Sequence, residues 1–153
     1  MEDNITTITQ SDLQEVAGEC LCLQMRQTAR RLSQRYDEYL QPSGLRLTQV
    51  SLLVAIALAH AIPLTCLADI LALDRTTLAR NLKPLERDGL VEVSPGVDKR
   101  VHLIRLTEQG QQHLLQALPY WRQAQEEVRA SLGSSQWEAL RADLRRLDTQ
   151  LSS

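Results

Sequence analysis

Residues 74–106, DRTTLARNLKPLERDGLVEVSPGVDKRVHLIRL, change their hydrophobic period partway along the stretch. Up to residue 87 the leucines recur every three or four positions, which predicts a helix with one face on a core. These core-facing leucines are Leu78, Leu82 and Leu85. Residues 90–93 and 101–106 are instead rich in β-branched side chains, alternate roughly, and flank a polar turn at 94–100. This second pattern predicts a β-hairpin with charge at its tip.

A second, shorter helix is expected immediately before this one. Thr65 is its predicted N-cap. The core-facing positions that follow at i, i+3 and i+4 are Leu67, Ile70 and Leu71. Asp74 is the predicted N-cap of the longer helix, which is expected to end at Asp88-Gly89. Two short helices joined by a tight turn and followed by a hairpin are the order of a winged helix-turn-helix, a fold whose second helix enters the major groove of DNA.

Long helical segments are expected on the N-terminal side. Residues 11–40 contain no proline, so they predict one helix with Ser11 as N-cap and with Gln41-Pro42-Ser43-Gly44 as its end. Because so long a helix overhangs a small core, its apolar stripe is expected to pair with a second copy of the chain. Thr48 is the predicted N-cap of the next helix, which is apolar nearly all round, ends near Ala61, and is expected to be central and buried.

The C-terminal side is expected to be helical as well. Thr107 is predicted to cap a long helix in which Pro119 introduces a kink or a weak turn, and residues 133–135 separate it from a last helix at 136–151. An apolar stripe runs along that last helix: Trp137, Leu140, Leu144, Leu147 and Leu151. The predicted fold is mainly α with a small β-hairpin wing. Its parts are an N-terminal dimerisation helix (1–40), a winged helix-turn-helix (41–106) and C-terminal dimerisation helices (107–153).

Composition and charge support this class and argue against several others. Only 3% of the residues are aromatic and none is Phe, which favours helices packed through Leu and Ala over a β-sandwich. The formal net charge is −2, yet residues 41–106 hold eight basic and six acidic side chains, so affinity for phosphate is expected there. The N-terminus lacks the features of a signal peptide, and no apolar span reaches 18 residues. We therefore expect a cytoplasmic protein that makes no membrane contact.

Cysteine and histidine usage points away from scaffolds and metal sites. Three cysteines, an odd number, argue against a disulfide framework. The histidines are too scattered in sequence to form a metal motif: His60, His102 and His113. No metal and no cofactor are expected.

The outer face of the 75–87 helix carries groups suited to DNA. Polar and basic side chains fall there at i, i+4 and i+7 and beside those positions. They are Thr76, Arg80 and Lys83, with Arg75, Thr77 and Ala79 next to them. Arginine can pair bidentately with guanine, and threonine can reach a base edge or a phosphate. The alternative is an ordinary solvated face. Pro84 removes the hydrogen bond to the Arg80 carbonyl, so a local kink is expected that changes the direction of Lys83.

The tip of the predicted hairpin is the second expected DNA contact. Lys99 and Arg100 are cations on a narrow projection, a shape that fits the minor groove and its negative potential. A free Asp98 would repel phosphate, so it is expected to orient Arg100 through a charge-assisted hydrogen bond. The alternative is an ordinary polar turn.

Several short motifs then occur in the order and spacing of a known family. They are LRLTQ (45–49), LERDGLV (85–91), DKR (98–100) and LTEQG (106–110). In these motifs the chain resembles the multiple-antibiotic-resistance regulator (MarR) family of bacterial repressors over nearly its whole length. The resemblance implies a triangular dimer built by the N- and C-terminal helices. It also implies that small-molecule or redox signals alter the spacing of the two DNA-binding heads.

The cysteines of the first helix need separate explanations. At 100° per residue Cys20 and Cys22 lie about 200° apart, so they cannot bridge within one helix. The spacing from Cys22 to Tyr36 is similar to that of the organic-hydroperoxide-sensing branch of the family, which implies that Cys22 is an oxidisable thiol and Tyr36 its partner. Leu47 stands where that branch has a second tyrosine. The alternative is that Cys22 is a small buried hydrophobic residue at the dimer seam, and Cys66 is expected to be core as well.

The sequence leaves three classes of protein open: a regulator with an unidentified effector, a thiol enzyme, and a helical adaptor. The effector of a regulator is either an oxidant or a small aromatic or carboxylate ligand, with Arg26, Arg30 or His60 available to an anion. A thiol enzyme, such as a small peroxidase built on Cys22, would need a base beside its nucleophile, and no histidine lies near it in sequence. A helical adaptor without DNA binding is the third. The pattern as a whole favours a homodimeric repressor that binds a palindromic double-stranded DNA operator, and it argues against an enzyme.

Overall fold

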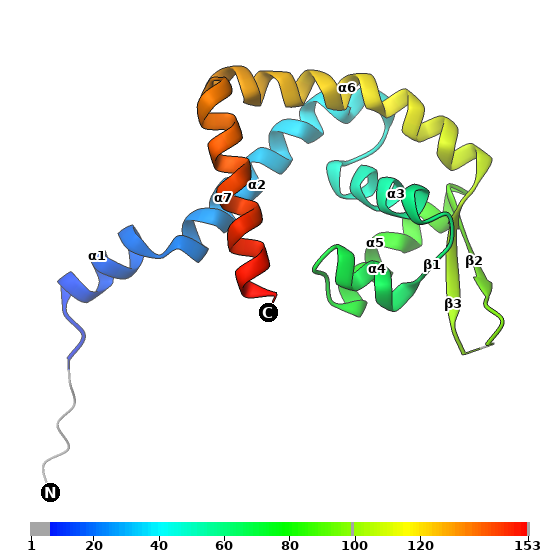
Figure 1. Ribbon diagram of the computed structural model, residues 1–153, viewed down its shortest axis with the longest axis horizontal. Helices are drawn as coiled ribbons and strands as arrows, with labels where there is room; N and C mark the ends of the chain where they lie inside the picture. Colours follow the sequence, from blue (N-terminus) through cyan, green and yellow to red (C-terminus); the bar gives the residue numbers. More distant parts are fainter. Residues whose placement is uncertain (1–6, 99, 153) are drawn as a thin grey trace, which may run out of the picture. The chain divides into compact units, whose positions relative to one another are not determined.

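The computed structural model describes residues 7–98 and 100–152. The chain divides into two compact units, Met1–Gln34 and Arg35–Ser153, and each is described by itself (Figure 1). Helix α2, Leu21–Leu40, begins in the first unit and ends in the second.

The first unit is helical, but its helix is interrupted. Helix α1 spans Gln10–Glu19 and is capped by Thr9, whose hydroxyl accepts from the Asp12 N–H while the Asp12 carboxylate accepts from the Thr9 N–H. Cys20 leaves the helical conformation (φ −66°, ψ 100°), and its carbonyl accepts from the Gln24 N–H, the first such bond of α2. The predicted single helix over 11–40 with Ser11 as N-cap is therefore wrong, because the capping box starts two residues earlier and the chain turns at Cys20.

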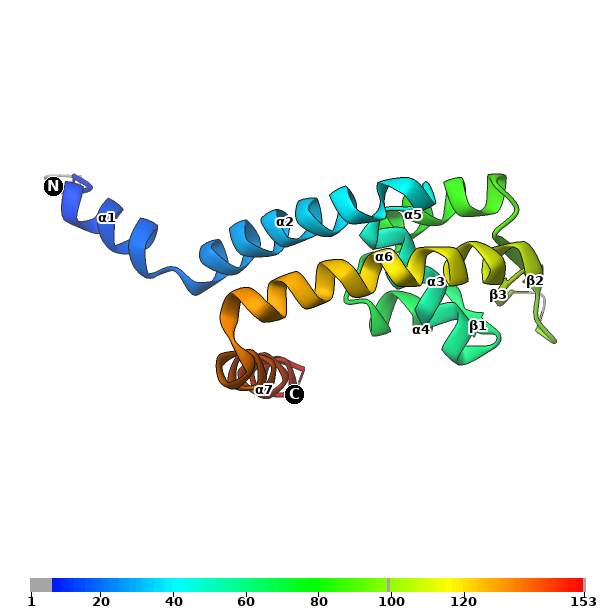
Figure 2. The ribbon, with the colours of Figure 1, turned by 90° about the horizontal axis from the view of Figure 1, so that it is seen from above.

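The second unit holds the remaining helices and the sheet (Figure 2). Its elements after α2 are the short 3₁₀ helix η1 Gln41–Ser43, α3 Leu47–Ala59, β1 Ile62–Pro63, α4 Leu64–Ile70, α5 Arg75–Arg87, β2 Val91–Pro95, β3 His102–Leu106, α6 Glu108–Leu132 and α7 Ser134–Leu151. The predicted end of the long N-terminal helix is confirmed by η1 and by Gly44 at φ +72°.

The core is formed where α3, α4, α5 and the sheet meet. Fully buried side chains come from each of them: Leu53, Ile56, Leu67, Leu78, Leu85 and Ile104. The predicted core face of α5 is confirmed, and so is the central position of α3, although Leu58 points outward. On α4 the prediction is wrong for Ile70, which is 64% exposed. The helix begins at Leu64, after Pro63 rather than at the predicted cap Thr65, and places Leu67 and Ala68 against the core.

The sheet contains the predicted hairpin and one strand that was not predicted. Its order is β1-β3-β2, all antiparallel, with Val93 opposite Ile104 in the hairpin. Ile62 pairs with Ile104 from the other side, so residues 62–63 form an edge strand and do not merely end a helix. Helix α3 ends two residues before predicted, at Ala59, and His60 takes a positive φ of 61° that redirects the chain into this strand.

Two predicted helix caps are confirmed, whereas the predicted start of α3 is wrong. Asp74 accepts from the Thr77 N–H and Thr107 from the Gly110 N–H, which confirms both predicted caps. The predicted cap Thr48 is wrong: α3 begins at Leu47, whose N–H donates to Asp37 of α2 at 2.7 Å.

The C-terminal helices continue the second unit. Helix α6 passes through Pro119 without interruption, so Pro119 marks no turn, and α7 starts at Ser134, directly after Gly133. No described residue of α7 is buried, and within the described part of the unit Leu140, Leu144 and Leu151 of its apolar stripe are exposed while Trp137 and Leu147 are half-buried. In that part of the chain no single helix is long and apolar enough to cross a bilayer. Residues 21–43 and 47–59 are long and apolar enough only when the two helices are taken together, and they are joined by a sharp bend.

Candidate nucleic-acid interface

The first turn of α5 is held by its N-cap. The Asp74 carboxylate accepts from the Thr77 N–H at 2.9 Å and from the Thr77 hydroxyl at 2.6 Å. The hydrogen bond from the Thr77 side chain is the largest cause of the lowered pKa of Asp74. Thr77 was predicted to contact DNA, but the structure gives its hydroxyl this structural bond and leaves the side chain half-buried.

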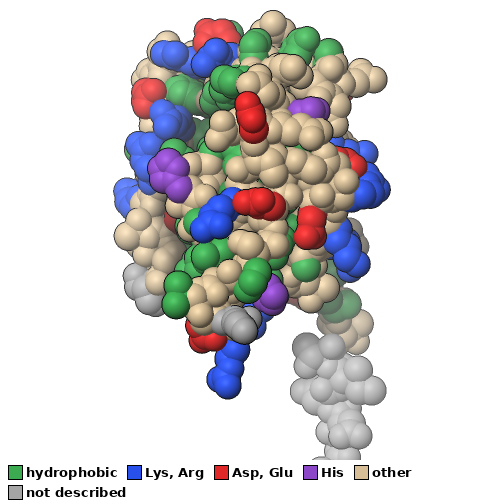
Figure 3. Space-filling model, turned by 90° about the vertical axis from the view of Figure 1, so that its right-hand side faces the viewer, with side chains coloured by type: hydrophobic (Ala, Val, Ile, Leu, Met, Phe, Trp, Pro, Cys, Tyr) green, Lys and Arg blue, Asp and Glu red, His purple; other side chains and the backbone are tan. Residues whose placement is uncertain are grey.

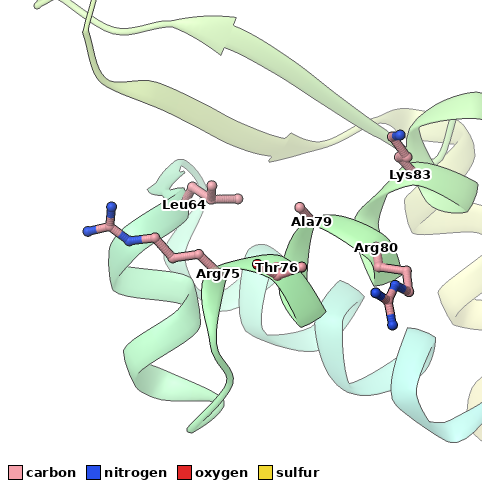
Figure 4. A pocket seen from close by; sticks show the side chains of 6 residues that line it. All are labelled: Leu64, Arg75, Thr76, Ala79, Arg80 and Lys83. Carbon is pink, nitrogen blue, oxygen red and sulfur yellow. The ribbon is translucent and has the colours of Figure 1, made fainter.

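The outer face of α5 brings the other predicted side chains together around one hollow. This hollow has a volume of about 520 Å³ and is lined by Leu64, Arg75, Thr76, Ala79, Arg80 and Lys83. Figure 4 shows Leu64 on α4 and Ala79 on α5 facing each other, while the guanidinium groups of Arg75 and Arg80 extend to opposite sides. All three cations of the face are exposed. The predicted i, i+4, i+7 grouping of Thr76, Arg80 and Lys83 therefore exists as a surface.

Pro84 does not end the helix that carries this surface. Helix α5 runs from Arg75 to Arg87 with Pro84 inside, and the Pro84 carbonyl accepts from the Asp88 N–H at 2.9 Å. Lys83 lines the same hollow as Arg80. Lys83 therefore stays on the outer face of α5, although the kink predicted at Pro84 was expected to turn it away from that face.

The wing tip is closed by backbone hydrogen bonds. The Gly96 N–H donates to the Val101 carbonyl at 2.7 Å, and the Val101 N–H to the Asp98 carbonyl at 2.9 Å. The Asp98 carboxylate accepts from the backbone N–H of Arg100 at 3.0 Å. The expected contact between Asp98 and the Arg100 guanidinium is therefore wrong: the carboxylate shapes the turn and leaves the exposed guanidinium to the solvent. Lys99 lies outside the described residues.

Basic side chains are visible on the hairpin side of the second unit. Figure 3 looks at the right-hand side of Figure 1 and shows Lys and Arg side chains along this face, one of them projecting at its foot. The Arg105 guanidinium donates to the Ser94 hydroxyl across the two strands at 3.5 Å, the limit of a hydrogen bond.

The base of the wing is fixed by contacts from the first turn of α6 that were not predicted from the sequence. The Thr107 hydroxyl donates to the Gly89 carbonyl at 2.6 Å, and the Gln109 amide to the Asp88 carbonyl at 3.2 Å. Gly110 packs so closely on the chain that a Cβ there would collide with the Leu90 carbonyl oxygen. These contacts tie the start of α6 to the end of α5. The LTEQG motif predicts the Thr107 cap, but it gives no local signal for the contacts of Thr107, Gln109 and Gly110 with residues 88–90.

The predicted sensing residues differ in burial: Cys22 is exposed in the single chain, whereas Tyr36 is buried. Cys22 and Cys66 are exposed in the chain, and the prediction that Cys66 is core is wrong, because the first turn of α4 turns it outward. Since Cys20 lies outside both helices, the 200° separation calculated for a continuous helix does not apply to it. Tyr36 is buried, which raises its pKa, and its hydroxyl donates to the Gln125 side chain.

The predicted anion-binding residues lie in different units of the chain. Arg26 and Arg30 are exposed on α2 within the first unit, whereas His60 is exposed at the end of α3 in the second. Within residues 7–98 and 100–152 no group of three or more His, Cys, Asp or Glu side chains could hold a metal ion.

By its fold and exposed basic helix, this chain falls in the class of winged helix-turn-helix transcriptional regulators. The MarR family model matches residues 45–102. MosR, a transcriptional regulator of M. tuberculosis solved in complex with DNA, is 43% identical with a TM-score of 0.79, covering 88% of this chain and 97% of that one. The chain belongs to the MarR family, whose members are transcriptional regulators and not enzymes.

Other relatives agree with this assignment. A mutant MarR of E. coli, solved in complex with operator DNA, superposes with a TM-score of 0.79 over 87% of this chain and 96% of that one, and at 24% identity it shows the shared fold. YwoH of Bacillus subtilis, an uncharacterised HTH-type transcriptional regulator, is 31% identical over 88 residues. That match spans 58% of this chain and 64% of the length of YwoH.

Proposed function

We propose that this MarR-family regulator is a homodimeric cytoplasmic repressor that binds a palindromic double-stranded operator. In this proposal α5 enters the major groove and the wing follows the flanking minor groove. The observation that carries the proposal is the grouping of Arg75, Arg80 and Lys83 around one exposed hollow on α5. The solved DNA complex of MosR supports the same use of the fold.

The chemistry of α5 suits a base-reading surface. Arginine offers a planar fork that pairs with guanine O6 and N7, and lysine can bind the same edge or a phosphate. Neither Arg80 nor Lys83 forms an ion pair among the described residues, so both are available to DNA without breaking an internal contact. Thr77 is better assigned to the helix cap, which aims the first turn, than to a base contact.

The wing is proposed to supply a minor-groove or phosphate contact. Arg100 is exposed beside a turn that Asp98 stabilises through the backbone, so the carboxylate is oriented toward the protein and the guanidinium is free for DNA. The narrow minor groove attracts arginine through its enhanced negative potential. Lys99 is proposed to add a second cation at the same tip.

Dimerisation is proposed because each unit exposes large apolar side chains that a lone chain leaves in water. In the first unit Leu13 and Val16 of α1 and Leu21 of α2 are more than 45% exposed. In the second, Leu140 and Leu144 of α7 are more than 40% exposed. Paired reading heads would match a palindromic operator, since a two-fold dimer presents two identical recognition helices to successive major grooves.

Release from DNA is proposed to follow an oxidant or a small-molecule signal. Exposed Cys22 is accessible to oxidant. A small aromatic or carboxylate ligand is the second candidate, with Arg26, Arg30 or His60 as the side chain that binds its anionic group.

Fluorescence anisotropy tests the proposed function directly. The full chain is titrated with a labelled fragment from upstream of its own gene and with a random fragment of equal length, across a salt series. Specific binding whose affinity falls steeply with salt is expected, because each phosphate contact releases a counterion. Equal affinity for both fragments at every salt concentration would contradict sequence-specific regulation.

Organic hydroperoxide then discriminates between the two inputs. If Cys22 is the switch, peroxide releases the wild type and the matched control Cys66→Ser, which also loses an exposed thiol, but not Cys22→Ser. A Cys22→Ser protein that still leaves DNA in peroxide would remove the thiol interpretation and direct the search to small carboxylate ligands.

A further inference from the structure

The hollow on α5 contains two apolar walls that the proposed cationic contacts do not use. Leu64, the first residue of α4, forms one wall, and Ala79 of α5 forms the other. Figure 4 shows the two side chains pointing toward each other, with the charged ends of Arg75 and Arg80 directed away from the space between them. The middle of the outer face of α5 is therefore an apolar slot.

Ala79 creates this slot by its size and position. Thr76, Ala79 and Lys83 lie at i, i+3 and i+7, so Ala79 is the centre of the exposed stripe. A methyl group at the centre of longer neighbours leaves a depression, and half-buried Leu64 closes it from α4. The floor offers no hydrogen-bond donor or acceptor from these two side chains.

In the major groove one base presents an apolar group. Thymine carries its C5-methyl there beside its O4 acceptor, whereas guanine, adenine and cytosine present only donors or acceptors. A polar base edge placed against Leu64 and Ala79 would lose hydrogen bonds to water without replacement. A thymine methyl would instead be removed from water by both side chains.

We propose that Leu64 and Ala79 form a thymine-methyl pocket, which makes them specificity-determining residues in each half-site. The inference rests on the proposed function, because it requires α5 to lie in the major groove. It predicts that one thymine of each half-site is recognised through its methyl group and without any hydrogen bond from these residues.

Deoxyuridine isolates the contact, because it differs from thymidine only by the missing methyl. The full-length protein is titrated with its upstream fragment carrying dU in place of one dT at a time. One thymine per half-site is expected to lose about fourfold in affinity, the value of one buried methyl, while the other replacements stay within twofold.

Protein variants assign that loss to the slot. In Leu64→Ala, the fourfold loss of affinity caused by dU at the sensitive thymine should shrink to less than twofold. Ile70→Ala changes an exposed residue of the same helix outside the hollow, so the fourfold loss should remain in that control. Ala79→Gln, which fills the slot from an exposed helical position, is the second variant and should also abolish the penalty. Circular dichroism checks that each variant is folded.

The outcomes separate the two claims. Specific DNA binding with no thymine sensitive to dU, or with a penalty unchanged in both Leu64→Ala and Ala79→Gln, overturns the methyl pocket and leaves the repressor proposal standing. Absence of any specific, salt-sensitive binding overturns the proposed function itself.

Discussion

At the scale of single residues, Arg100 is the simplest test of the wing. Replacing Arg100 by Ala removes an exposed guanidinium that makes no ion pair with Asp98 among the described residues, so folding should be unaffected. Operator affinity should fall by about tenfold or more, and the salt slope should become shallower by about one charge per protomer. The measurement is anisotropy across a salt series, with Arg122→Ala on α6 as the control. Wild-type affinity in Arg100→Ala would refute the wing contact.

Gly110 is required because the backbone contact at this position leaves no room for a side chain. A Cβ at this position would collide with the Leu90 carbonyl oxygen and would also meet Leu106 at 2.6 Å, so Gly110→Ala must push α6 away from the wing base. We expect a loss of about 1–3 kcal/mol in the free energy of unfolding, measured by urea denaturation.

Gly18 supplies a matched control, because Gly18→Ala is not expected to lower the free energy of unfolding. Nothing lies within 4 Å of a Cβ built there, and the residue is helical in α1. Gly18→Ala should therefore be neutral or stabilising by up to about 1 kcal/mol. Equal effects of the two substitutions would show that the tight packing at Gly110 is not what holds the wing base.

At the scale of elements, the features that were predicted correctly depend on short-range interactions, although the short-range cap at Thr9 was also missed. The hairpin, helix α5 and the caps Asp74 and Thr107 depend on residues a few positions apart, and all were predicted. The start of α3 depends on Asp37, ten residues away, and strand β1 depends on pairing with β3, forty residues away. Neither signal is present in a local window, so both were missed.

The candidate site shows the same division. The outer face of α5 follows from helical periodicity, so the grouping of Arg80 and Lys83 could be predicted. The apolar slot could not, because Leu64 reaches it from a different helix. The role of Asp98 was predicted wrongly for a related reason. The sequence shows that a carboxylate lies near Arg100, but it does not show whether that carboxylate accepts a hydrogen bond from the backbone N–H or from the guanidinium.

The ion pair between α2 and α6 gives a pH-dependent prediction. The Arg35 Nε donates to Glu127 at 3.0 Å. Hydrogen bonding from Arg35, and next from Tyr39, lowers the pKa of Glu127 below 4.5. A carboxyl with a lowered pKa in the folded state stabilises the fold above its unfolded value, and this contribution is lost as the pH falls through the folded pKa. The melting temperature should therefore decline below about pH 4.5 partly through Glu127.

Glu127→Gln tests this contribution. The variant should lose part of the acid-side decline, and at pH 7 its melting temperature should be lower by at most about 2 °C, because the pair is partly exposed and screened. Circular dichroism melts from pH 3 to 7 provide the measurement, and Glu126→Gln, the adjacent exposed position, is the control. An unchanged pH profile in Glu127→Gln would show that the pair does not contribute.

At the scale of the whole molecule, the proposed function requires two copies. The exposed stripe of α7 is the part of the proposed interface that lies in the same compact unit as α5 and the wing. Leu144 is 43% exposed on this stripe, so Leu144→Glu should place a charge in the interface without disturbing the core. Sedimentation should then give 17.3 kDa for the variant and twice that mass for the wild type.

DNA binding should report the same change. A monomer holds one half-site, so Leu144→Glu should lose at least about tenfold in affinity for the full operator, with roughly half the salt slope, since slope scales with the phosphates contacted. For an isolated half-site the variant and the wild type should bind with similar affinity, because α5 and the wing are unchanged. Ala142→Glu, on the opposite face of α7, controls for added charge. A Leu144→Glu protein that remains dimeric and binds the operator normally would place the interface elsewhere. A monomeric variant with full operator affinity would instead show that one reading head is sufficient and that the palindrome is not needed.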